Sequence, residues 1–467
     1  MKVRFLRFFF PFGAAIALVI AMLVFVLPGP APTAAAPTFT VNSPTDATDA
    51  NPGDGSCDTG GGVCTLRAAI MEANHTPGGG TTIHFGLPGV VTYLLAIPMS
   101  GTDDEATGDL NITQSMTIIG NGAEKTIIDG NGGALGDHVI EITGTVSIIG
   151  VTIQHGYSTY WGGGILDNGA LTLVNSAIIN NTADGPQNSG GGIYSAGPVT
   201  LTNSTLSGNT SGEFGGGIYS INGLSIIDST VSGNSTGSIG GGIGTEAKPS
   251  IIMGSTISGN TALSGGGIFK NGSILNIINS TISGNHSNGN GGGIYNNSET
   301  MSLYNVTVEQ NLANADATDA GDGGGVFNRS GTVNFENSII AQNQNIVIID
   351  GIPQLNFEDC AGTIDSLGDN LMYETSGCMV NGPIIIADPL LGPLAGNGGP
   401  TLTYALLPGS PAIDTGNPIG CTDNLGAFLT RDQRGYPRPG FRGGALRCDL
   451  GAFEYSFPSL FLPLIVR

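Results

Sequence analysis

The feature that most constrains this chain is a block of roughly 25 residues that recurs between residues 175 and 343. Each block holds Ser-Gly-Asn or a variant of it, and all but the last continue with a gap and then Gly-Gly-Gly with an aliphatic residue, as in "TLSGNTSGEFGGGIYS" from Thr205 to Ser220. A period of roughly 20 to 50 residues indicates a solenoid or a propeller, because each unit can bury its apolar face only against its neighbours. Seven blocks align on Asn175, Asn203, Asp228, Gly254, Asn279, Asn305 and Asn337, with spacings of 28, 25, 26, 25, 26 and 32 residues.

The aligned blocks read as strands. Three positions after the alignment point the residue is always aliphatic, and two and four positions before it thirteen of fourteen residues are apolar. This alternation has a period of two, and no block contains a ten-residue amphipathic helical stretch. A block of this length suits one coil of three short strands and three bends, whereas a propeller blade needs about 40 residues. The sequence therefore predicts an all-β, right-handed parallel β-helix whose coils stack at about 4.8 Å.

In such a solenoid each position lies above its copy in the previous coil, so repeated residues form ladders. Six positions after the alignment point every block has asparagine, and we expect these side chains to hydrogen-bond to one another. The glycine triplets are expected where the chain turns sharply and neighbouring backbones approach. A phosphate-binding role for the triplets is disfavoured, because no Lys-Ser or Lys-Thr follows them and no helix begins there. The ladder consists of Asn181, Asn209, Asn234, Asn260, Asn285, Asn311 and Asn343.

The N-terminus has the pattern of an export signal. Lys2, Arg4 and Arg7 precede an apolar run from Phe8 to Leu27, and small residues follow as a candidate cleavage site ending at Ala36. An uncleaved membrane anchor is the alternative, because the run is long enough to span a bilayer. In either case the remainder is expected outside the cytoplasm, secreted or attached to the cell surface, with no integral membrane domain once the signal is cleaved.

The six cysteines agree with export. An even number of cysteines in an exported chain favours disulfides, and none of them forms a Cys-x-x-Cys metal motif. We expect sequential pairing, although six cysteines permit fifteen connectivities. No metal and no other cofactor is predicted. The expected pairs are Cys57 with Cys64, Cys360 with Cys378, and Cys421 with Cys448.

The charge of the chain excludes nucleic acid as a partner. The formal net charge is −22, from 36 acidic and 14 basic residues. Between residues 80 and 430 the basic residues are Lys125, Lys248, Lys270 and Arg329. Neutralising phosphates requires several Lys or Arg on one face, which this stretch does not supply.

Both ends of a solenoid must be covered, because an open end exposes unpaired strands. At the front, Leu66, Ala69, Ile70 and Ala73 form one helical stripe after Thr65 as N-cap, which predicts an amphipathic lid. At the back, residues 388–455 lose the repeat and are expected to form a separate capping module. Its arginines are expected to pair with the acidic solenoid; they are Arg431, Arg434, Arg438, Arg442 and Arg447.

Three segments resemble pieces of known bacterial surface proteins. "CTLRAA", from Cys64 to Ala69 within residues 39–74, resembles the core of the CSLREA domain, although Ala68 stands where that core has Glu. The repeats with "SGN…GGGIY" resemble polymorphic outer-membrane-protein repeats and the β-helix class that includes pectate lyases. "DPLLGPLAGNGGPTLTYALLPGSPAIDTGN", with "CDLGAFEY" further on, resembles the choice-of-anchor Q domain, a module that precedes surface-attachment tails in its family.

These resemblances and the repeat give a division of the chain. The expected parts are a signal peptide (1–36), a CSLREA-like cap (37–80), the β-helix (81–350), disulfide-bearing terminal coils (351–387), a choice-of-anchor Q-like domain (388–455) and a short hydrophobic tail (456–467).

The predicted function is that of a non-catalytic adhesive or scaffold protein, with polysaccharide or cell-envelope glycan as its candidate partner. A row of aromatic residues follows the Gly-Gly-Gly-Ile segments, and alternation along a strand predicts that these rings point outward. Stacked rings are a common surface for binding sugars, whereas the structural alternative is that the rings seal the edges of the coils. The row consists of Tyr194, Tyr219, Phe269, Tyr295 and Phe327, with Gly244 interrupting it.

A polysaccharide lyase or hydrolase is the alternative function. Elimination from a uronate needs a base, usually Arg or Lys in this class of β-helix, and Lys270 and Arg329 lie closest to the regular glycine corners. Hydrolysis needs two facing carboxylates, for which Asp103 and Asp104 are the one adjacent aspartate pair. The "QHG" that contains His155 is interpreted as a chance match.

A calcium site is the other alternative. Asp316, Asp319 and Asp322 lie in the loop that fills the longest repeat spacing, but they lack the order of an EF-hand. An inserted, solvated loop is the favoured interpretation.

Overall fold

The computed structural model describes residues 36–101, 104–318, 321–438 and 447–455. All described residues belong to one compact unit. The signal peptide, the hydrophobic tail, Arg442 and the two aspartates at positions 103 and 319 lie outside the described residues. Within the described ranges, no helix is long and apolar enough to cross a membrane.

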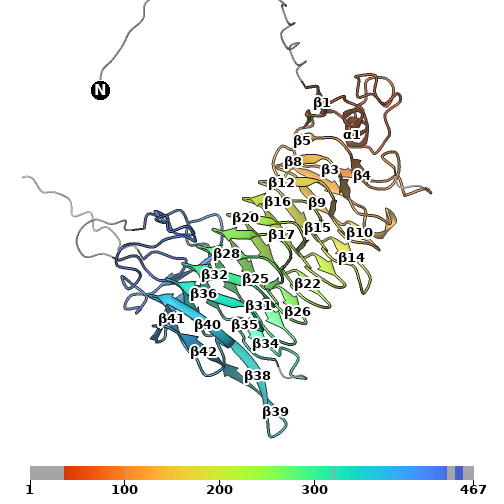
Figure 1. Cartoon of the computed structure of the whole chain (residues 1–467). Coiled ribbons are helices and arrows are strands. Elements are labelled where there is room, and N and C mark those ends of the chain that lie inside the picture. Colours follow the sequence, from red (N-terminus) through yellow and green to blue (C-terminus); the bar gives the residue numbers. More distant parts are fainter. Residues whose placement is uncertain (1–35, 102–103, 319–320, 439–446, 456–467) are drawn as a thin grey trace, which may run out of the picture. The chain divides into compact units, whose positions relative to one another are not determined.

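The predicted right-handed parallel β-helix is confirmed. Successive coils stack along one axis, from the cap with β1 and α1 to the coil with β41 and β42 (Figure 1). A regular coil contains four strands rather than the expected three, because a two-residue strand precedes each glycine triplet. We name the four stacks of strands sheets I to IV. The strand that follows a glycine triplet belongs to sheet IV, and the chain then passes through sheets I, II and III before the next triplet. Sheets I and IV are joined into 22 strands by β40, which pairs with both.

Sheet I contains β1 (Thr38–Val41), β2 (Thr81–Phe85), β5 (Met116–Ile119), β8 (Thr145–Ile149), β12 (Ala170–Val174), β16 (Val199–Thr202), β20 (Leu224–Ile227), β24 (Ser250–Met253), β28 (Leu275–Ile278), β32 (Thr300–Tyr304), β36 (Thr332–Glu336), β40 (Cys360–Gly368) and β42 (Cys378–Asn381). Sheet II contains β3 (Val91–Leu94), β6 (Thr126–Asp129), β9 (Thr152–Gln154), β13 (Ala177–Ile179), β17 (Thr205–Ser207), β21 (Thr230–Ser232), β25 (Thr256–Ser258), β29 (Thr281–Ser283), β33 (Thr307–Glu309), β37 (Ile339–Ala341), β41 (Leu371–Met372) and β43 (Ile385–Ile386).

Sheet III contains β10 (Tyr157–Ser158), β14 (Thr182–Ala183), β18 (Thr210–Ser211), β22 (Ser235–Thr236), β26 (Thr261–Ala262), β30 (His286–Ser287), β34 (Leu312–Ala313), β38 (Gln344–Ile349) and β39 (Ile352–Phe357), the last antiparallel. Sheet IV contains β4 (Leu110–Ile112), β7 (Ile140–Ile142), β11 (Ile165–Asp167), β15 (Ile193–Ser195), β19 (Ile218–Ser220), β23 (Ile243–Thr245), β27 (Ile268–Lys270), β31 (Ile294–Asn296) and β35 (Val326–Asn328). A hairpin of β44 (Leu391–Ala395) and β45 (Thr403–Leu406), the helix α1 (Leu66–Asn74) and the short 3-10 helix η1 (Gly132–Ala134) complete the elements.

The bends follow from residue types that tolerate a left-handed backbone. All seven residues used to align the repeat have φ between 45° and 64°, and each stands between a strand of sheet I and one of sheet II. Asn, Asp and Gly are the residues that adopt this conformation most readily. The sharp bend there explains why strict alternation stops at this point in every block.

The asparagines of the ladder lie directly over one another inside the next bend. The Nδ2 of Asn209 donates to the Oδ1 of Asn234 at 3.0 Å, and the backbone N–H of Asn209 donates to the same oxygen. The pattern repeats from Asn181 to Asn343, where the Oδ1 of Asp359 accepts the last two hydrogen bonds. Because every member is fully buried, each hydrogen bond satisfies a group that would otherwise be costly to bury.

A second ladder of serines follows the first bend and was not recognised in the sequence. The backbone N–H of Ser204 donates to the Oγ of Ser229, and Ser229 donates in the same way to Ser255. Its signal was present, because Ser follows the alignment point in six of the seven blocks.

The glycine triplets have the expected structural role. The first glycine of each triplet has φ between 61° and 74°. A Cβ on the third glycine of one triplet, Gly192, would lie 2.6 Å from the carbonyl oxygen of Gly217 and 3.0 Å from the side chain of Asn209. Glycine is thus required where the asparagine amide packs under the neighbouring backbone.

The helix α1 closes the first coil as the sequence predicts. Thr65 accepts a hydrogen bond from the backbone of Ala68, and the apolar stripe of the helix belongs to the main core. The fully buried Arg67 holds Asp46 through two hydrogen bonds of 2.7 and 3.1 Å. All three disulfides join the expected pairs, Cys57–Cys64, Cys360–Cys378 and Cys421–Cys448.

Residues 388–455, which the sequence predicts as a capping module, contact the side of the solenoid. These residues fold back beside the solenoid and cover its flank across sheet II, next to β28, β32 and β36 (Figure 1). Gln433 packs against two neighbouring coils, where its side chain hydrogen-bonds to Ser255, Thr256 and Thr281. The described part of the segment therefore covers a face of the solenoid.

Most of the described arginines in residues 388–455 do not pair with the acidic solenoid, contrary to the prediction from the sequence. Arg434 pairs with Asp432 at 2.6 Å and Arg438 with Glu454 at 2.8 Å, both within the segment itself. Among the described arginines of the segment, Arg447 is the one that reaches a solenoid carboxylate, Asp369, at 3.7 Å. Buried charges need partners at hydrogen-bond distance, and the segment supplies them locally.

Candidate functional site

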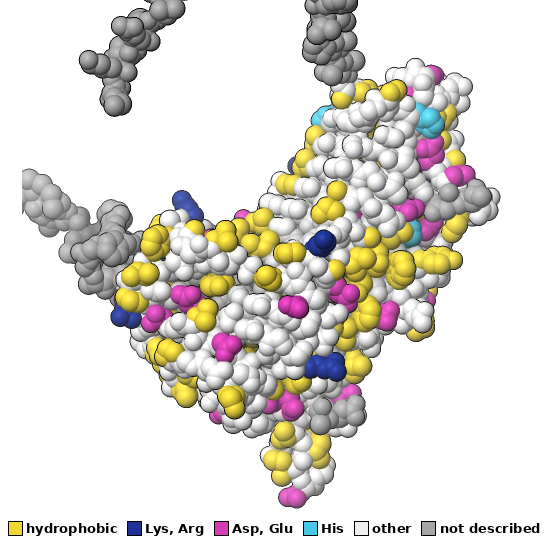
Figure 2. Space-filling model, viewed as in Figure 1, with side chains coloured by type: hydrophobic (Ala, Val, Ile, Leu, Met, Phe, Trp, Pro, Cys, Tyr) yellow, Lys and Arg dark blue, Asp and Glu magenta, His cyan; other side chains and the backbone are white. Residues whose placement is uncertain are grey.

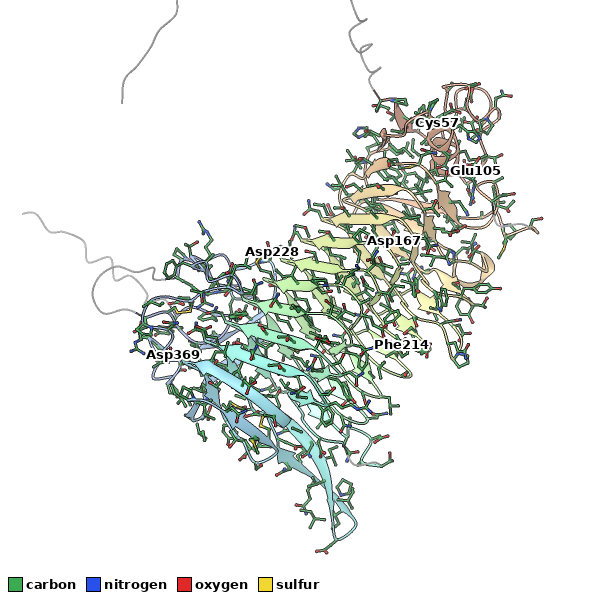
Figure 3. The ribbon with its side chains drawn as sticks, in the orientation of Figure 1. Cys57, Glu105, Asp167, Phe214, Asp228 and Asp369 are labelled. Atoms are coloured by element: carbon green, nitrogen blue, oxygen red, sulfur yellow. A yellow bond between two sulfur atoms is a disulfide. The ribbon has the colours of Figure 1, made fainter. Side chains whose placement is uncertain are left out.

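The predicted aromatic row lies on sheet IV, but its rings are covered. Tyr194, Tyr219, Phe269 and Tyr295 are only 6–8 % exposed, and Phe327 is half-buried. The loops between sheets III and IV fold over them: the ring of Phe214 packs 5.1 Å from that of Tyr219 (Figure 3). The rings point outward as expected, but they are too deeply buried in this structure to form an exposed platform. Carbohydrate stacking on this row stays a prediction, and the burial argues against it.

The gap at Gly244 is filled by its neighbour in the row. A Cβ at Gly244 would lie 2.8 Å from the Cδ2 of Tyr219, so the tyrosine ring occupies the space of the missing side chain. Trp161 continues the row at its front end, where it stacks on Tyr194 at 4.9 Å between centroids. Trp161 is 48 % exposed, which makes it the accessible ring of this stack.

A groove lies next to β10, where the early coils bend from sheet II to sheet III. It encloses about 460 Å³. In Figure 2 acidic, histidine and hydrophobic side chains gather over β10 and β14, close to this bend. We call it the His155 groove; its lining residues are Leu94, Asp129, Asn131, Gly132, His155, Gly156, Tyr157, Asn180 and Thr182.

Asp129 and His155 form the polar centre of this groove. Asp129 ends β6, and its carboxylate accepts hydrogen bonds from the Nε2 of Gln154 (2.8 Å), the backbone of Asn131 (2.9 Å) and the Nδ1 of His155 (3.0 Å). Burial alone would raise the pKa of Asp129, but these hydrogen bonds outweigh it and hold the pKa below its usual value. The carboxylate is therefore ionised at neutral pH.

The hydrogen bond to Asp129 also fixes the imidazole of His155. A neutral ring that donates from Nδ1 keeps Nε2 as a hydrogen-bond acceptor. His155 has φ of 55°, because it occupies the same left-handed bend as Asn180 in the next coil. Its side chain is 47 % exposed, so the ring is open to a ligand in the groove.

Tyr157 forms an aromatic wall of the groove. It belongs to β10, and its hydroxyl donates to the carboxylate of Asp184. This hydrogen bond, more than burial, raises the pKa of Tyr157. The ring and its held hydroxyl give the groove an apolar face beside polar groups.

Sequence reasoning missed this site because it dismissed His155. The structure pairs Asp129 with Gln154 in adjacent strands of sheet II, 25 residues apart. Extending the repeat alignment to the less regular coils before residue 175 would have placed Asp129 beside the "QHG" motif. The repeat period of about 25 residues is the feature of the sequence that could have indicated this pairing.

The basic residues considered for catalysis lie elsewhere. Lys270 is 1 % exposed inside the coils, where its Nζ donates to the carbonyl oxygen of Ser298, and burial lowers its pKa to about 8. Arg329 donates to Asn297 at the surface. The described lining of the His155 groove contains neither Lys nor Arg.

The loop considered for calcium gives no metal cluster among its described residues. Asp316 accepts a hydrogen bond from the backbone of Thr318, and Asp322 donates its backbone N–H to the Oδ1 of Asn290. In the described part of the chain, three metal-ligating side chains meet instead at Asp109, His138 and Glu141.

Comparison with known proteins supports the fold and leaves the function open. No family model matches the sequence, and no curated protein matches it. The structure resembles the crystal structure of the pectate lyase Pel9A with a TM-score of 0.53, over 90 % of this chain and 97 % of that chain. The two sequences are 15 % identical in this alignment, so the likeness shows the fold alone.

Proposed function

We propose that this protein is an exported β-helix protein, secreted or attached to the cell surface, that binds polysaccharide in the His155 groove without cleaving it. The observation that carries the proposal is the set of oriented polar groups around Asp129 and His155 beside the ring of Tyr157. Sugar ligands offer hydroxyl groups in fixed directions and apolar ring faces. A site for them combines held donors and acceptors with an aromatic surface.

The neighbour on which the chain superposes is a pectate lyase, which is consistent with a polysaccharide ligand for a β-helix of this kind. The acidic charge of the chain disfavours a polyanionic ligand, because no Lys or Arg in the described lining of the groove would neutralise it. We therefore infer a neutral polysaccharide or cell-envelope glycan as the ligand.

The test is retention on a glycan array by the wild-type protein and by the double variant Asp129→Asn, His155→Asn. Asparagine at position 155 keeps a residue that tolerates the left-handed bend, so the fold should persist. We expect retention to fall at least about tenfold, since hydrogen bonds that involve a charged group contribute about 1.5–3 kcal/mol. The double variant should remain folded, which its circular dichroism spectrum checks.

The matched control is Gln342→Asn. Gln342 occupies the same left-handed bend in a later coil, with φ of 51°, and does not line the groove. Retention should match the wild type. If the control and the double variant bind alike, the groove is not the binding site.

The aromatic row gives a competing location that can be tested in the same array. Trp161→Ala removes its exposed ring, whereas Tyr219→Ala would also open the core. Loss of retention in Trp161→Ala alone would move the site from the groove to the row.

A polysaccharide lyase or hydrolase is the second candidate, and the Asp129–His155 pair is the observation that favours it. A carboxylate on Nδ1 orients an imidazole so that Nε2 can take a proton from a substrate. The test is a depolymerisation assay that detects both unsaturated uronates and new reducing ends. Product from the wild type that disappears in His155→Asn, while binding persists, would replace the binding proposal with this one.

The named resemblances complete the proposal. We infer that the signal segment exports the protein, that residues 37–80 act as a CSLREA-like cap, and that residues 388–455 act as a choice-of-anchor Q-like domain. The three disulfides support export, because such bonds persist in oxidising compartments. Fractionation of cells that produce the whole chain tests this part: recovery in the cytoplasm would contradict it.

A further inference from the structure

A cluster of metal-ligating side chains lies in the early coils, outside the groove. Asp109 stands directly before β4, Glu141 is the middle residue of β7, and His138 precedes β7 by two residues. Strands β4 and β7 pair in parallel, which brings the three residues together from adjacent coils. One ligand atom from each side chain lies within 4.8 Å of the other two.

The imidazole of His138 is oriented as in a metal ligand. Its Nδ1 lies 3.2 Å from the Oγ of Ser158, which holds one ring nitrogen. Its Nε2 faces two carboxylates, with the Oδ2 of Asp109 at 3.8 Å and the Oδ1 of Asp137 at 3.4 Å. Histidine ligands characteristically bind through one nitrogen while the other is held by a hydrogen bond.

The spacing of these atoms fits a common metal ion. When two ligand atoms each lie about 2.1 Å from a tetrahedral ion, they are about 3.4 Å apart. The Nε2 of His138 and the Oδ2 of Asp109 are 3.8 Å apart, slightly above this value.

Burial and charge point the same way. Asp109, Asp137 and His138 are each less than 5 % exposed, and Glu141 is partly buried, with its Oε1 accepting from Asn168 at 3.2 Å. Three carboxyl groups thus surround one imidazole in a place largely closed to water. A divalent cation next to these side chains would be held strongly, because attraction between opposite charges is stronger where burial excludes water.

We propose that Asp109, His138 and Glu141 bind one divalent transition-metal ion. The mixed nitrogen and oxygen donors favour Zn²⁺ over Ca²⁺ and Mg²⁺, which prefer oxygen ligands throughout. The ligands come from two adjacent coils, so the ion would tie these coils together, with a water molecule completing a four-coordinate shell. The site adjoins strand β10. Tyr157 of this strand lines the His155 groove, and the Oγ of Ser158 lies 3.2 Å from the Nδ1 of His138.

Calorimetric titration of the chelator-treated, folded protein with ZnCl₂ tests the proposal, and elemental analysis of the dialysed protein gives the stoichiometry. We expect one Zn²⁺ per chain, with Ca²⁺ binding far more weakly. Co²⁺ in place of Zn²⁺ should give the strong visible absorption of a four-coordinate site. Absence of Zn²⁺ binding would overturn the proposal.

Variants separate ligands from bystanders. His138→Gln should weaken Zn²⁺ binding more than about 100-fold, beyond the 10- to 100-fold that loss of a supporting hydrogen bond costs, as expected for Ser158→Ala. The matched control is His286→Gln, since His286 is exposed on β30 and far from the cluster in sequence. If His138→Gln does not fold, Glu141→Gln, at a more exposed ligand, provides the same comparison. Unchanged Zn²⁺ affinity in a folded ligand variant, or equal loss in the control, would contradict the site.

Discussion

Sheet II has two halves with similar rows of side chains but different surroundings. We call them the open half, which contains β17 and β21, and the covered half, which contains β29 and β33. In β17 and β21 the outward threonines and serines are partly exposed to solvent. In β29 and β33 the residues of the same rows are buried, because residues 399–455 pack against them. At the border between the halves, next to Asp228 (labelled in Figure 3), a hollow of about 420 Å³ is also lined by residues 428–435.

The difference shows that the solenoid alone does not decide which of its faces is a surface. The rows of Thr and Ser are compatible with water in one half and with a packed protein segment in the other, because hydroxyl groups can hydrogen-bond to either. The open half also contains the His155 groove. We call residues 388–455 the covering segment. This segment thus limits the stretch of sheet II on which a long ligand can lie.

The largest loss of stability is expected when a buried ion pair within the covering segment is broken. Arg438→Ala would leave Glu454 buried without its partner at 2.8 Å and would remove hydrogen bonds to Asn279 and Gly451. We expect a loss of about 3–5 kcal/mol in the stability of the covered half. Urea unfolding measures the loss, and limited proteolysis should show release of the covering segment.

The control for this variant is Arg447→Ala. Its ion pair with Asp369 is half exposed and 3.7 Å long, so the expected loss is at most about 1 kcal/mol. Equal losses in the two variants would mean that the segment is not held by its internal ion pairs.

The asparagine ladder should be insensitive to the covering segment. Asn209→Ala in the open half and Asn285→Ala in the covered half each leave a backbone N–H and an amide of the preceding coil without their acceptor. We expect both variants to lose about 2–3 kcal/mol in free energy of unfolding. A much larger loss in Asn285→Ala, measured by the same urea titration, would show that the covering segment supports the interior as well.

The halves are also expected to differ in their response to pH. Glu309 of the covered half takes the place that Ser232 has in the open half, and burial, more than the neighbouring Asp359 and Asp388, raises its pKa to about 9. The folded state therefore holds a proton that the unfolded state has released above about pH 4.5. Stability should fall as pH rises from about 5 to 9, by up to about 1.4 kcal/mol for each pH unit.

Glu309→Gln isolates this effect, since the amide does not titrate. The slope of the thermal midpoint between pH 5 and 9 should become shallower in this variant. Other buried carboxyl groups with raised pKa, Asp359 among them, give a slope of the same sign that remains. An unchanged slope would show that Glu309 is ionised in the folded protein.

The sequence predicted the interior of this molecule well and its surface poorly. The ladder from Asn181 to Asn343 and the glycine corners repeat in every coil, so one alignment locates them all. The burial of Tyr219 depends on loops such as the one with Phe214, whose lengths and residues vary from block to block. The position of residues 388–455 depends on contacts between segments far apart in the sequence, for which periodicity gives no signal.

The candidate site shows the same limit. Asp129 and His155 come from coils that precede the regular blocks, so neither was aligned with the repeat. The cluster at His138 joins residues 29 and 3 positions apart on two strands, which no short motif describes. Stacking of coils brought these groups together, and only the register of the strands reveals it.

The smallest expected effect is the most direct comparison of the two halves, because it changes the same residue type in the same row. The Oγ1 of Thr281 donates to the Oε1 of Gln433 at 2.7 Å in a fully buried place, whereas Thr205 is partly exposed in the open half. Valine keeps the shape of threonine and removes the hydroxyl. Thr281→Val should therefore cost about 1–2 kcal/mol, because it leaves a buried amide oxygen without its donor. Thr205→Val should change stability by no more than about 0.5 kcal/mol, because water replaces the hydroxyl's partners. Urea unfolding of both variants measures the difference, and equal values would mean that the covering segment adds no specific contacts to the row it hides.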